Sequence, residues 1–345
     1  MIRSVIQGVG SYLPEKILTN ADLAGESSYH PLLDEVVQRL DRVGLLQESE
    51  GADVVFPPGF TNREGEPLPL IVRKGNGGFN YATSDLACVI DRVERIGATL
   101  MLYVVGAPQA QHFEMVWKVC EMAGWLRPPA RCVHVQFGSV LGADRKMFKT
   151  RSGDTVKLGE LLEEAEERAL KIVSEKSPEL PEVQRREIAR VVGLGAVKYA
   201  DLLPNRQSDY QFNWEKMLAL QGNTAPYLQY AYTRVRSIFR KSGANAETGA
   251  RNAETALAAA DELALAKHLM NFGLVLETVA DECRPNFLCN YLYELAGLFA
   301  RFYESCPVLK AEGTERATRL LLCDLTGRVL RQGLATLGIE VTEQM

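Results

Sequence analysis

Three tyrosines stand beside two arginines in the second half of the chain, at Tyr227, Tyr230 and Tyr232 followed by Arg234 and Arg236. Aromatic rings can stack on unpaired bases, and guanidinium groups can hold the phosphates between those bases. This arrangement predicts a helix surface that binds single-stranded RNA. The same residues also fit a buried aromatic helix with a solvated basic edge, and the residue types alone leave both interpretations open.

A short basic loop, Lys149-Thr150-Arg151-Ser152, follows a segment that is predicted to be a strand. A basic loop at the carboxyl side of an α/β sheet can hold a triphosphate and neutralise the charge that develops as pyrophosphate leaves. The alternative interpretation is an ordinary solvated loop.

A third group combines Tyr81 and Asp85 with Gln109 and His112. A carboxylate grips a planar cation through two parallel hydrogen bonds, while a phenol and an amide fix the rest of the ligand. Tyr81 and Asp85 lie four residues apart at a predicted helix start, so both can face one crevice at the carboxyl ends of the strands. Alternatively, Asp85 is a first-turn carboxylate favoured by the helix dipole, and Tyr81 belongs to the core.

The elements that must position these residues alternate between strands and helices up to about residue 150. Predicted strands are 68–73, 79–82, 99–105 and 132–141, and predicted helices are 32–46, 83–96 and 111–123. Asn76-Gly77 is a hairpin turn signal, and Thr83-Ser84-Asp85 is predicted to cap the helix after it. The uninterrupted apolar run 99–105 indicates a buried parallel strand. The alternation predicts a doubly wound α/β sheet.

From about residue 155 the pattern is helical to the last residue. Segments with a 3.6-residue period cover 157–177, 181–203, 224–241, 250–282, 286–305 and 314–336. They predict an all-helical bundle over 156–345, with a Leu/Phe stripe at 288–302 in its core. An α/β part over 26–155 and a short strand and turn over 1–25 precede the bundle.

The composition fits a soluble globular protein of two domains, with 345 residues, 46% of them apolar and 24% charged. The net charge of −5 excludes a general attraction to polyanions, so RNA would have to meet local basic patches. The seven cysteines form no Cys-x-x-Cys pair and the four histidines have no metal-ligand spacing, which argues against structural zinc and for a reducing cytoplasm. Without a signal-peptide pattern or a run of eighteen apolar residues, we expect a cytoplasmic protein with no membrane contact.

Taken together, these motifs resemble the class I arginyl-tRNA synthetases in their bacterial form. The run 222–237 (GNTAPYLQYAYTRVRS) resembles the start of their anticodon-binding helical domain. The run 134–142 (HVQFGSVLG) and the basic loop after it resemble their second nucleotide-binding signature, with Arg151 in place of the usual second lysine. The resemblance covers 26–345. It implies a partial Rossmann-type nucleotide-binding half-domain, of the α/β class, followed by an all-α anticodon-binding bundle.

The resemblance also implies roles for the candidate residues. Those that would hold the arginine side chain are Tyr81, Asp85 and Gln109, and those that would contact ATP are His112, Phe137, Gly138 and Val140. The catalytic phosphate contacts would come from Lys146, Lys149 and Arg151. The residues that would contact tRNA are Tyr227, Tyr230, Arg234, Arg236 and Tyr303. The implied substrates are L-arginine, ATP with Mg²⁺ and arginine tRNA, with no bound metal or organic cofactor and no DNA. One position departs from the family, because Gly106 stands where an Asp is usual.

The His-x-Gly-His signature of this family, which stabilises the α-phosphate in the transition state, is not found in the sequence, since no two of its histidines lie within three residues of each other. We therefore expect the C-terminal half of an arginine–tRNA ligase that binds tRNA without being fully catalytic alone, and a complementing N-terminal half as a further partner. A sheet reduced in this way should expose an apolar edge along Leu70, Ile71, Leu102 and Val104.

Residues 1–24 resemble something else, the first strand and turn of the 3-oxoacyl-acyl-carrier-protein synthase III enzymes, and are interpreted as a foreign N-terminal segment. Two alternatives to the ligase therefore stay open. One is a non-catalytic tRNA-binding or regulatory module, and the other is an acyl-transfer enzyme, which only residues 1–24 suggest.

Overall fold

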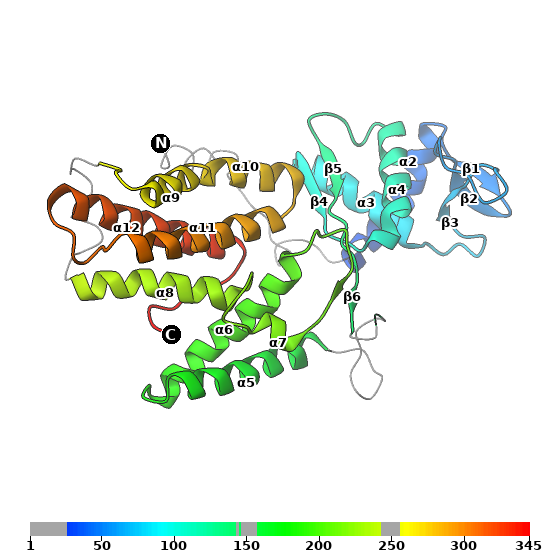
Figure 1. The fold of residues 1–345 in the computed structure, drawn as a ribbon. Helices are drawn as coiled ribbons and strands as arrows, with labels where there is room; N and C mark the ends of the chain where they lie inside the picture. The colour runs from blue at the N-terminus through cyan, green and yellow to red at the C-terminus, as the bar shows by residue number, and fades with distance from the viewer. Residues whose placement is uncertain (1–25, 143–144, 146–156, 243–255) are drawn as a thin grey trace. The chain divides into compact units, whose positions relative to one another are not determined.

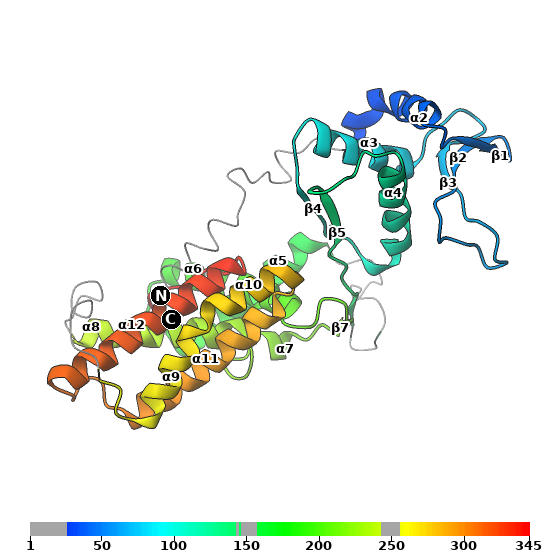
Figure 2. The same ribbon diagram turned by 90° about the horizontal axis from the view of Figure 1, so that it is seen from above.

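The structure is a computed structural model, described here over residues 26–142, 145, 157–242 and 256–345. The chain forms two compact units, which divide between Gly138 and Ser139. Each is considered by itself (Figures 1 and 2). The boundary expected near residue 155 and the N-terminal segment 1–25 lie outside the described residues, so both stay predictions.

The first unit combines an antiparallel sheet with a parallel pair of strands and the helices that pack on them. Its elements are η1 (Glu26–Leu32), α2 (Leu33–Arg42), β1 (Gln47–Ser49), β2 (Ala52–Val55), β3 (Leu70–Arg73), α3 (Tyr81–Glu94), β4 (Leu100–Tyr103), η2 (Ala107–Gln109), α4 (Ala110–Met122) and β5 (Arg131–His134). Strands β1, β2 and β3 form an antiparallel meander, of which the sequence analysis predicted only β3. Strands β4 and β5 are parallel, with Leu100 opposite Arg131. The α/β class predicted for this part is confirmed.

The turn predicted at Asn76-Gly77 is present, with the Gly77 N–H donating to the Lys74 carbonyl and Gly77 at a φ of +81°. The strand expected after it, 79–82, is reduced to a single antiparallel bridge between Arg73 and Phe79. The strand stops there because the next residue already caps a helix.

Helix α3 begins at Tyr81 because Asn80 caps it. The Asn80 side chain accepts a hydrogen bond from the Ala82 N–H, which satisfies one of the free donors of the first turn. Thr83, which the sequence analysis placed in the cap, instead donates its hydroxyl to the Val72 carbonyl on β3. The predicted cap was wrong by three residues, and the helix therefore starts earlier than expected.

Strand β4 buries one face and exposes the other. Met101 and Tyr103 are buried against the helices, whereas Leu100, Leu102 and Val104 are 46, 49 and 65% exposed. Parallel strands in α/β folds are normally covered on both faces. Among the described residues β4 also pairs with a neighbour on one side only. The strand that was expected to be buried is thus an open edge with an apolar outer face.

Of the four residues expected along one exposed edge, two lie on β3 and two lie on or just after β4, and these strands belong to separate sheets. Ile71 is 39% exposed, and Leu102 and Val104 are exposed as expected. Leu70 is only 5% exposed, so that prediction was wrong. Its side chain points into the core because neighbouring residues of a strand face opposite sides.

The second unit is almost entirely helical. Its elements are β6 (Val140–Leu141), α5 (Leu158–Lys176), α6 (Glu182–Leu202), β7 (Tyr210–Gln211), α7 (Trp214–Met217), α8 (Ala225–Ser242), α9 (Ala260–Met270), α10 (Phe272–Glu282), α11 (Asn286–Ser305) and α12 (Gly313–Thr336). The strand expected over 132–141 is split, because β6 pairs in parallel with β7 in this unit while β5 belongs to the other. The predicted all-helical bundle is confirmed.

The predicted Leu/Phe stripe of α11 lies in the core of this bundle. Leu288, Leu292, Leu295, Phe299 and Phe302 are each at most 1% exposed. They meet the buried faces of α8, α9 and α12, so one apolar cluster joins most of the helices. Burial of this stripe contributes to the stability of the bundle through the apolar area that it removes from water.

Helices α5 and α6 form an antiparallel pair that depends on small residues (Figure 1). A Cβ atom on Gly193 of α6 would lie 2.7 Å from the carbonyl oxygen of Ala165 on α5. Ala165 and Ala169 are completely buried at this contact. The two backbones approach closely because no side chain separates them at Gly193.

One long helix was expected over 250–282, but its described part forms two helices that meet at Asn271. The segment Ala260–Glu282 has the length and hydropathy of a membrane span, which the sequence analysis did not anticipate, and 22% of its most apolar 18-residue window is buried. Core helices of soluble proteins pass the same test. Leu265, Leu269 and Phe272 are at most 1% exposed, so one face of this segment packs in the bundle core, whereas Leu263, Met270 and Leu274 on its other face are exposed.

A buried ion pair connects the start of α9 to α12. Arg319 Nε donates to Glu262 Oε1 at 2.7 Å, and the Glu262 side chain is 1% exposed. Glu262 Oε2 also accepts from the backbone N–H groups of Ala258 and Ala259, and Arg319 also donates to the Pro307 carbonyl. These contacts satisfy both buried charges, which would otherwise be costly.

We predict that Glu262→Gln lowers the free energy of unfolding by about 1.5–3 kcal/mol, because it removes the buried carboxylate partner of Arg319 and leaves only the exposed one, Glu315. Thermal unfolding followed by circular dichroism, with hydrogen exchange of α9 and α12, measures the loss. The matched control is Glu182→Gln, whose carboxylate pairs with Arg186 in a fully exposed i,i+4 pair and whose loss should leave the unfolding transition nearly unchanged.

The contribution of Glu262 should also depend on pH. Burial alone would raise the pKa of its carboxyl, but the backbone N–H groups and Arg319 hold that pKa below its usual value of 4.5. The stabilisation is therefore complete above that usual value and disappears as the pH falls through the lower folded pKa. An unfolding free energy for the variant equal to that of the wild type at neutral pH would contradict this prediction.

Candidate functional site

In the first unit, Asp85 and His112 form the centre of the candidate small-molecule site. His112 Nε2 lies 2.6 Å from Asp85 Oδ2, and the side chains are 32 and 30% exposed. Asp85 is on the second turn of α3, and His112 is on the first turn of α4. The structure thus joins two residues that are 27 positions apart and that the sequence analysis placed in one candidate group. A half-exposed carboxylate of this kind has one edge free to accept hydrogen bonds from a cation.

Tyr81 and Gln109 are both exposed, Tyr81 to 75%. Tyr81 starts α3 one turn before Asp85, and Gln109 ends η2 just before α4. The interpretation of Tyr81 as a core residue is therefore wrong. Tyr81, Gln109 and the Asp85–His112 pair lie at the N-terminal ends of α3 and α4, where the backbone N–H groups of a helix lack intrahelical acceptors.

Phe137 and Gly138 continue the same unit beyond β5. Phe137 makes a parallel bridge with Gly106, its carbonyl accepts a hydrogen bond from the Ala107 N–H, and its ring is 46% exposed. Gly106, the departure from the family pattern, lies beside the Phe137 ring, since a Cβ added at Gly106 would be 3.9 Å from that ring. The segment offers exposed backbone and one exposed ring, as expected for a surface that receives a planar base.

The remaining predicted ATP and phosphate residues are not brought to this site by the described structure. Val140 belongs to the second unit, where it is paired with Tyr210. Lys146, Lys149 and Arg151 lie outside the described residues.

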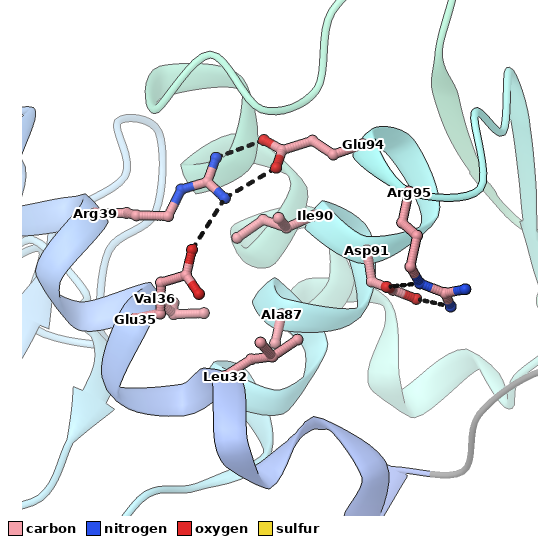
Figure 3. Close-up of a pocket in the computed structure, with 9 residues that line it drawn as sticks. All are labelled: Leu32, Glu35, Val36, Arg39, Ala87, Ile90, Asp91, Glu94 and Arg95. Atoms are coloured by element: carbon pink, nitrogen blue, oxygen red, sulfur yellow. Dashed lines mark hydrogen bonds and ion pairs between the residues drawn. The ribbon is translucent and has the colours of Figure 1, made fainter.

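A cavity of about 150 Å³ lies elsewhere in this unit, between α2 and α3 (Figure 3). Its floor is apolar, and ion pairs line it, Arg39 with Glu94 and Arg95 with Asp91. None of the predicted substrate residues lines it. Because these guanidinium groups already have carboxylate partners, we interpret the cavity as a feature of helix packing.

In the second unit, α8 and α11 together present the candidate RNA surface. Tyr227 of α8 meets Tyr293 of α11 edge-on, with ring centroids 5.7 Å apart. Further along both helices, the Arg234 guanidinium lies 4.8 Å from the centroid of the Tyr303 ring. Tyr230, between these contacts on α8, is 46% exposed. Three of the tyrosines selected from the sequence therefore share one surface with Arg234.

The structure adds Tyr293 to this surface, at 37% exposure. The sequence analysis took the stripe at 288–302 as core and did not separate out the residues between its buried positions. The available signal was an aromatic residue that falls outside the 3.6-residue apolar stripe of its helix. Next to it in the helix turn, Gly297 has no atom within 4 Å of an added Cβ, so the helix surface there is open.

Tyr232 and Arg236 do not join this surface. Tyr232 is 3% exposed, and its hydroxyl donates to Glu343. Arg236 Nε donates to the same carboxylate at 2.7 Å. Residues two positions apart on a helix are rotated by about 200°, so Arg234 and Arg236 occupy opposite flanks of α8. The sequence analysis treated Arg234 and Arg236 as one group, but they lie on two different surfaces of α8.

The surroundings raise the pKa of one side chain on each flank of α8, Tyr227 and Arg236. Partial burial raises the pKa of the Tyr227 hydroxyl, which keeps it a neutral hydrogen-bond donor. The hydrogen bond to Glu343 raises the pKa of Arg236 further above its usual value. Neither group changes its charge near neutral pH.

Comparisons with known proteins agree with this arrangement. The sequence model for the catalytic domain of class I tRNA synthetases specific for arginine matches residues 12–214, and the one for the DALR anticodon-binding domain matches residues 228–345. The first match begins inside the segment that was expected to be foreign. The fold and the two candidate surfaces thus define a class I aminoacyl-tRNA synthetase architecture, and the catalytic-domain match alone covers more than half of the chain.

Within this class, the relatives and solved structures that resemble the chain include enzymes named as specific for arginine. The chain is 52% identical over 325 residues to the arginine–tRNA ligase of Trichodesmium erythraeum and 53% identical over 329 residues to that of Azotobacter vinelandii. These matches cover 93 and 95% of the chain. It also resembles the crystal structure of Plasmodium falciparum arginyl-tRNA synthetase, with a TM-score of 0.82 at 29% identity over 99% of this chain and 57% of that one.

The chain belongs to the arginyl-tRNA synthetase family. It spans about 56% of the length of the curated relatives it matches. The chain also resembles the structure of the Thermus thermophilus arginyl-tRNA synthetase, with a TM-score of 0.78 at 27% identity over 91% of this chain and 58% of that one.

Proposed function

We propose that this chain supplies the anticodon-reading part and the C-terminal side of the arginine and ATP site of an arginine–tRNA ligase. The observation that carries the proposal is the exposed surface of α8 and α11, where Tyr227, Tyr230, Tyr293 and Tyr303 accompany Arg234. Tyr230 and Tyr293 are exposed, whereas Tyr227 and Tyr303 are partly buried and pack against the bundle core. Accessible rings next to a guanidinium group suit unpaired bases and the phosphates that join them.

For the small-molecule site we propose that Asp85 holds the guanidinium group of L-arginine, with Tyr81 and Gln109 beside it. His112 orients Asp85 through their 2.6 Å contact and faces ATP, whose adenine would meet the backbone and ring of Phe137 and the backbone of Gly138. ATP would enter as its Mg²⁺ complex, as a substrate. Val140 and the basic residues Lys146, Lys149 and Arg151 remain proposed partners of ATP and its phosphates.

The catalytic step is proposed to need a second polypeptide. The exposed face of β4, formed by Leu100, Leu102 and Val104, and its open edge are surfaces that a neighbouring strand and helix would cover. We propose that a complementing N-terminal half of the synthetase is that neighbour. Without it the chain would act as a non-catalytic tRNA-binding module, which is the second candidate function.

The acyl-transfer alternative finds no support in the comparisons, since the synthetase match begins at residue 12 and runs on from there. We also propose a cytoplasmic location. All seven cysteines are free, and burial raises the pKa of Cys132, Cys289 and Cys323 to about 12, so these thiols stay protonated and unreactive. Structural thiols of this kind suit a reducing compartment.

We predict that Tyr303→Ala or Tyr227→Ala weakens binding of an arginine-tRNA anticodon stem-loop by about tenfold, since stacking on one ring contributes roughly 1–3 kcal/mol. Fluorescence anisotropy of a labelled stem-loop measures the change. Tyr81→Ala is the matched control, because it removes an exposed tyrosine from the other unit and should leave RNA affinity unchanged. Equal affinity for cognate and unrelated stem-loops, unaffected by either substitution in the bundle, would exclude this function.

We further predict that the chain alone aminoacylates arginine tRNA far more slowly than an intact relative, because one lost transition-state donor already costs about 3–4 kcal/mol. Adding the N-terminal half of the Azotobacter vinelandii enzyme should raise the rate at least tenfold. Leu102→Glu should abolish that gain, because it places a charge on the face to be covered.

The control for this second prediction is Leu274→Glu, which changes an equally large leucine, 63% exposed, on the helical unit. It should leave the gain intact. Aminoacylation by the chain alone within a few fold of an intact relative would show that no partner is needed, and an unchanged gain in the Leu102 variant would show that the partner docks elsewhere.

A further inference from the structure

The last residues of the chain lie across the flank of α8 that faces away from α11. In Figure 1 the red C-terminal end runs beside α8 and α6. The Glu343 side chain accepts hydrogen bonds from Tyr232 at 3.0 Å and from Arg236 at 2.7 Å. The Glu343 backbone carbonyl accepts a third, from Arg240 at 2.7 Å. One tail residue therefore engages both arginines of this flank.

Contacts on either side anchor the tail. Ile339 is 2% exposed in the bundle core, and Met345 packs on the apolar cluster of α5 and α6. Between them, the Glu340 carboxylate pairs with Arg190 of α6 at 2.8 Å, and the Glu340 carbonyl accepts from the Gln229 amide of α8. Glu343 thus sits in a fixed place rather than at a free end.

Hydrogen bonding is nevertheless incomplete where the C-terminal tail contacts the bundle. Gln229 Oε1 and Thr342 Oγ1 are buried without a hydrogen-bond partner among the described residues. Buried polar groups without partners favour any rearrangement that satisfies them. The contact with Arg236 is also partly open to solvent, because the Arg236 and Glu343 side chains are 37 and 59% exposed. Displacement of the Glu343 carboxylate by another anion therefore needs no opening of the core.

The arginine flank is close to the aromatic surface although it faces another way. Arg236 and Arg240 are one turn apart on the same side of α8, and Tyr230 lies on the exposed ridge between them and the Tyr227–Arg234 flank. A helix with its side chains is about 10–12 Å across. A stem-loop that stacks on the tyrosines thus brings its backbone within reach of this flank. Asp324 and Arg331 of α12 are the other charged groups whose fields reach the site.

We propose that Arg236 and Arg240 form a second phosphate site for the bound RNA, and that the Glu343 carboxylate occupies this site in the free protein until a phosphodiester displaces it. This inference rests on the proposed function, since it assigns a further part of the same RNA surface. Carboxylate and phosphate oxygens make the same charge-assisted hydrogen bonds to a guanidinium group, so one can replace the other. The C-terminal tail then acts as an internal competitor that weakens RNA binding.

Glu343→Gln in the full chain tests the proposal, by anisotropy titrations of the arginine-tRNA anticodon stem-loop over a range of salt concentrations. We expect binding to tighten about two- to fivefold, which is the effect of removing one partly exposed ion pair. The plot of log K against log salt should steepen by about 0.7 for the added phosphate contact. In an Arg236→Gln background the gain should disappear, because the site itself is then lost.

The matched control is Glu340→Gln, which removes the same charge from the same tail at a side chain that is 63% exposed and pairs with α6 instead of α8. It should leave the RNA affinity within experimental error. Equal gains in the two variants would reduce the effect to net charge and overturn the proposal. Weaker binding by the Glu343 variant would also overturn it, because Glu343 would then be positioning Arg236 for RNA.

A second titration with inorganic tripolyphosphate separates this inference from the proposed function. A gain in tripolyphosphate affinity in the Glu343 variant alone, with no stem-loop binding by any form, would keep the anion site and exclude RNA reading. No gain with tripolyphosphate would overturn the competition, whatever the stem-loop titrations show.

Discussion

Burial of one side of α8 fixes the orientation of both candidate RNA surfaces. Leu228, Val235 and Ile238 are at most 1% exposed, and they lie on one side of the helix because residues three, four and seven positions apart share a face. With that side in the core, the helix cannot rotate about its axis. Tyr227 and Arg234 are thereby held against α11 on one flank, and Arg236 is held against the C-terminal tail on the other. The surfaces are a geometric consequence of the core.

Much of this fold could be read from the sequence, because hydrophobic periodicity carries most of the information. The long helices of the second unit and the core stripe of α11 follow from patterns that extend over ten residues or more, and the parallel strand β4 follows from the shorter apolar run 99–105. The errors in the predicted elements occur where a few local residues determine the point at which a helix begins or ends. Asn80 was not chosen over Thr83 as the cap, and the break at Asn271 was missed although Gly273 follows it by two residues. Local competition between similar caps cannot be resolved by periodicity.

The candidate sites show the same limit. Selecting Tyr227, Tyr230 and Tyr303 required only residue types and the resemblance to a family, and the structure places them on one surface. The pairing of Arg236 with Glu343 joins residues 107 positions apart, and no periodicity within either segment reports it. The contact between Asp85 and His112 likewise depends on how α3 and α4 pack, although both residues were candidates from the start.

The contrast between two glycines shows how this bundle combines stability with an open surface. At Gly193 the backbone of α5 occupies the space that a side chain would need. Replacement by alanine would therefore force the two helices apart, despite the better helix propensity of alanine. Gly297 has free space around it on α11, where alanine would be gained at no steric cost and would stabilise the helix by about 0.5–1 kcal/mol. With glycine at 297, α11 lacks this stabilisation but has no side chain that projects from its surface beside Tyr293. Engineering for thermal resistance would therefore select a larger residue at 297, and selection for ligand recognition would oppose it.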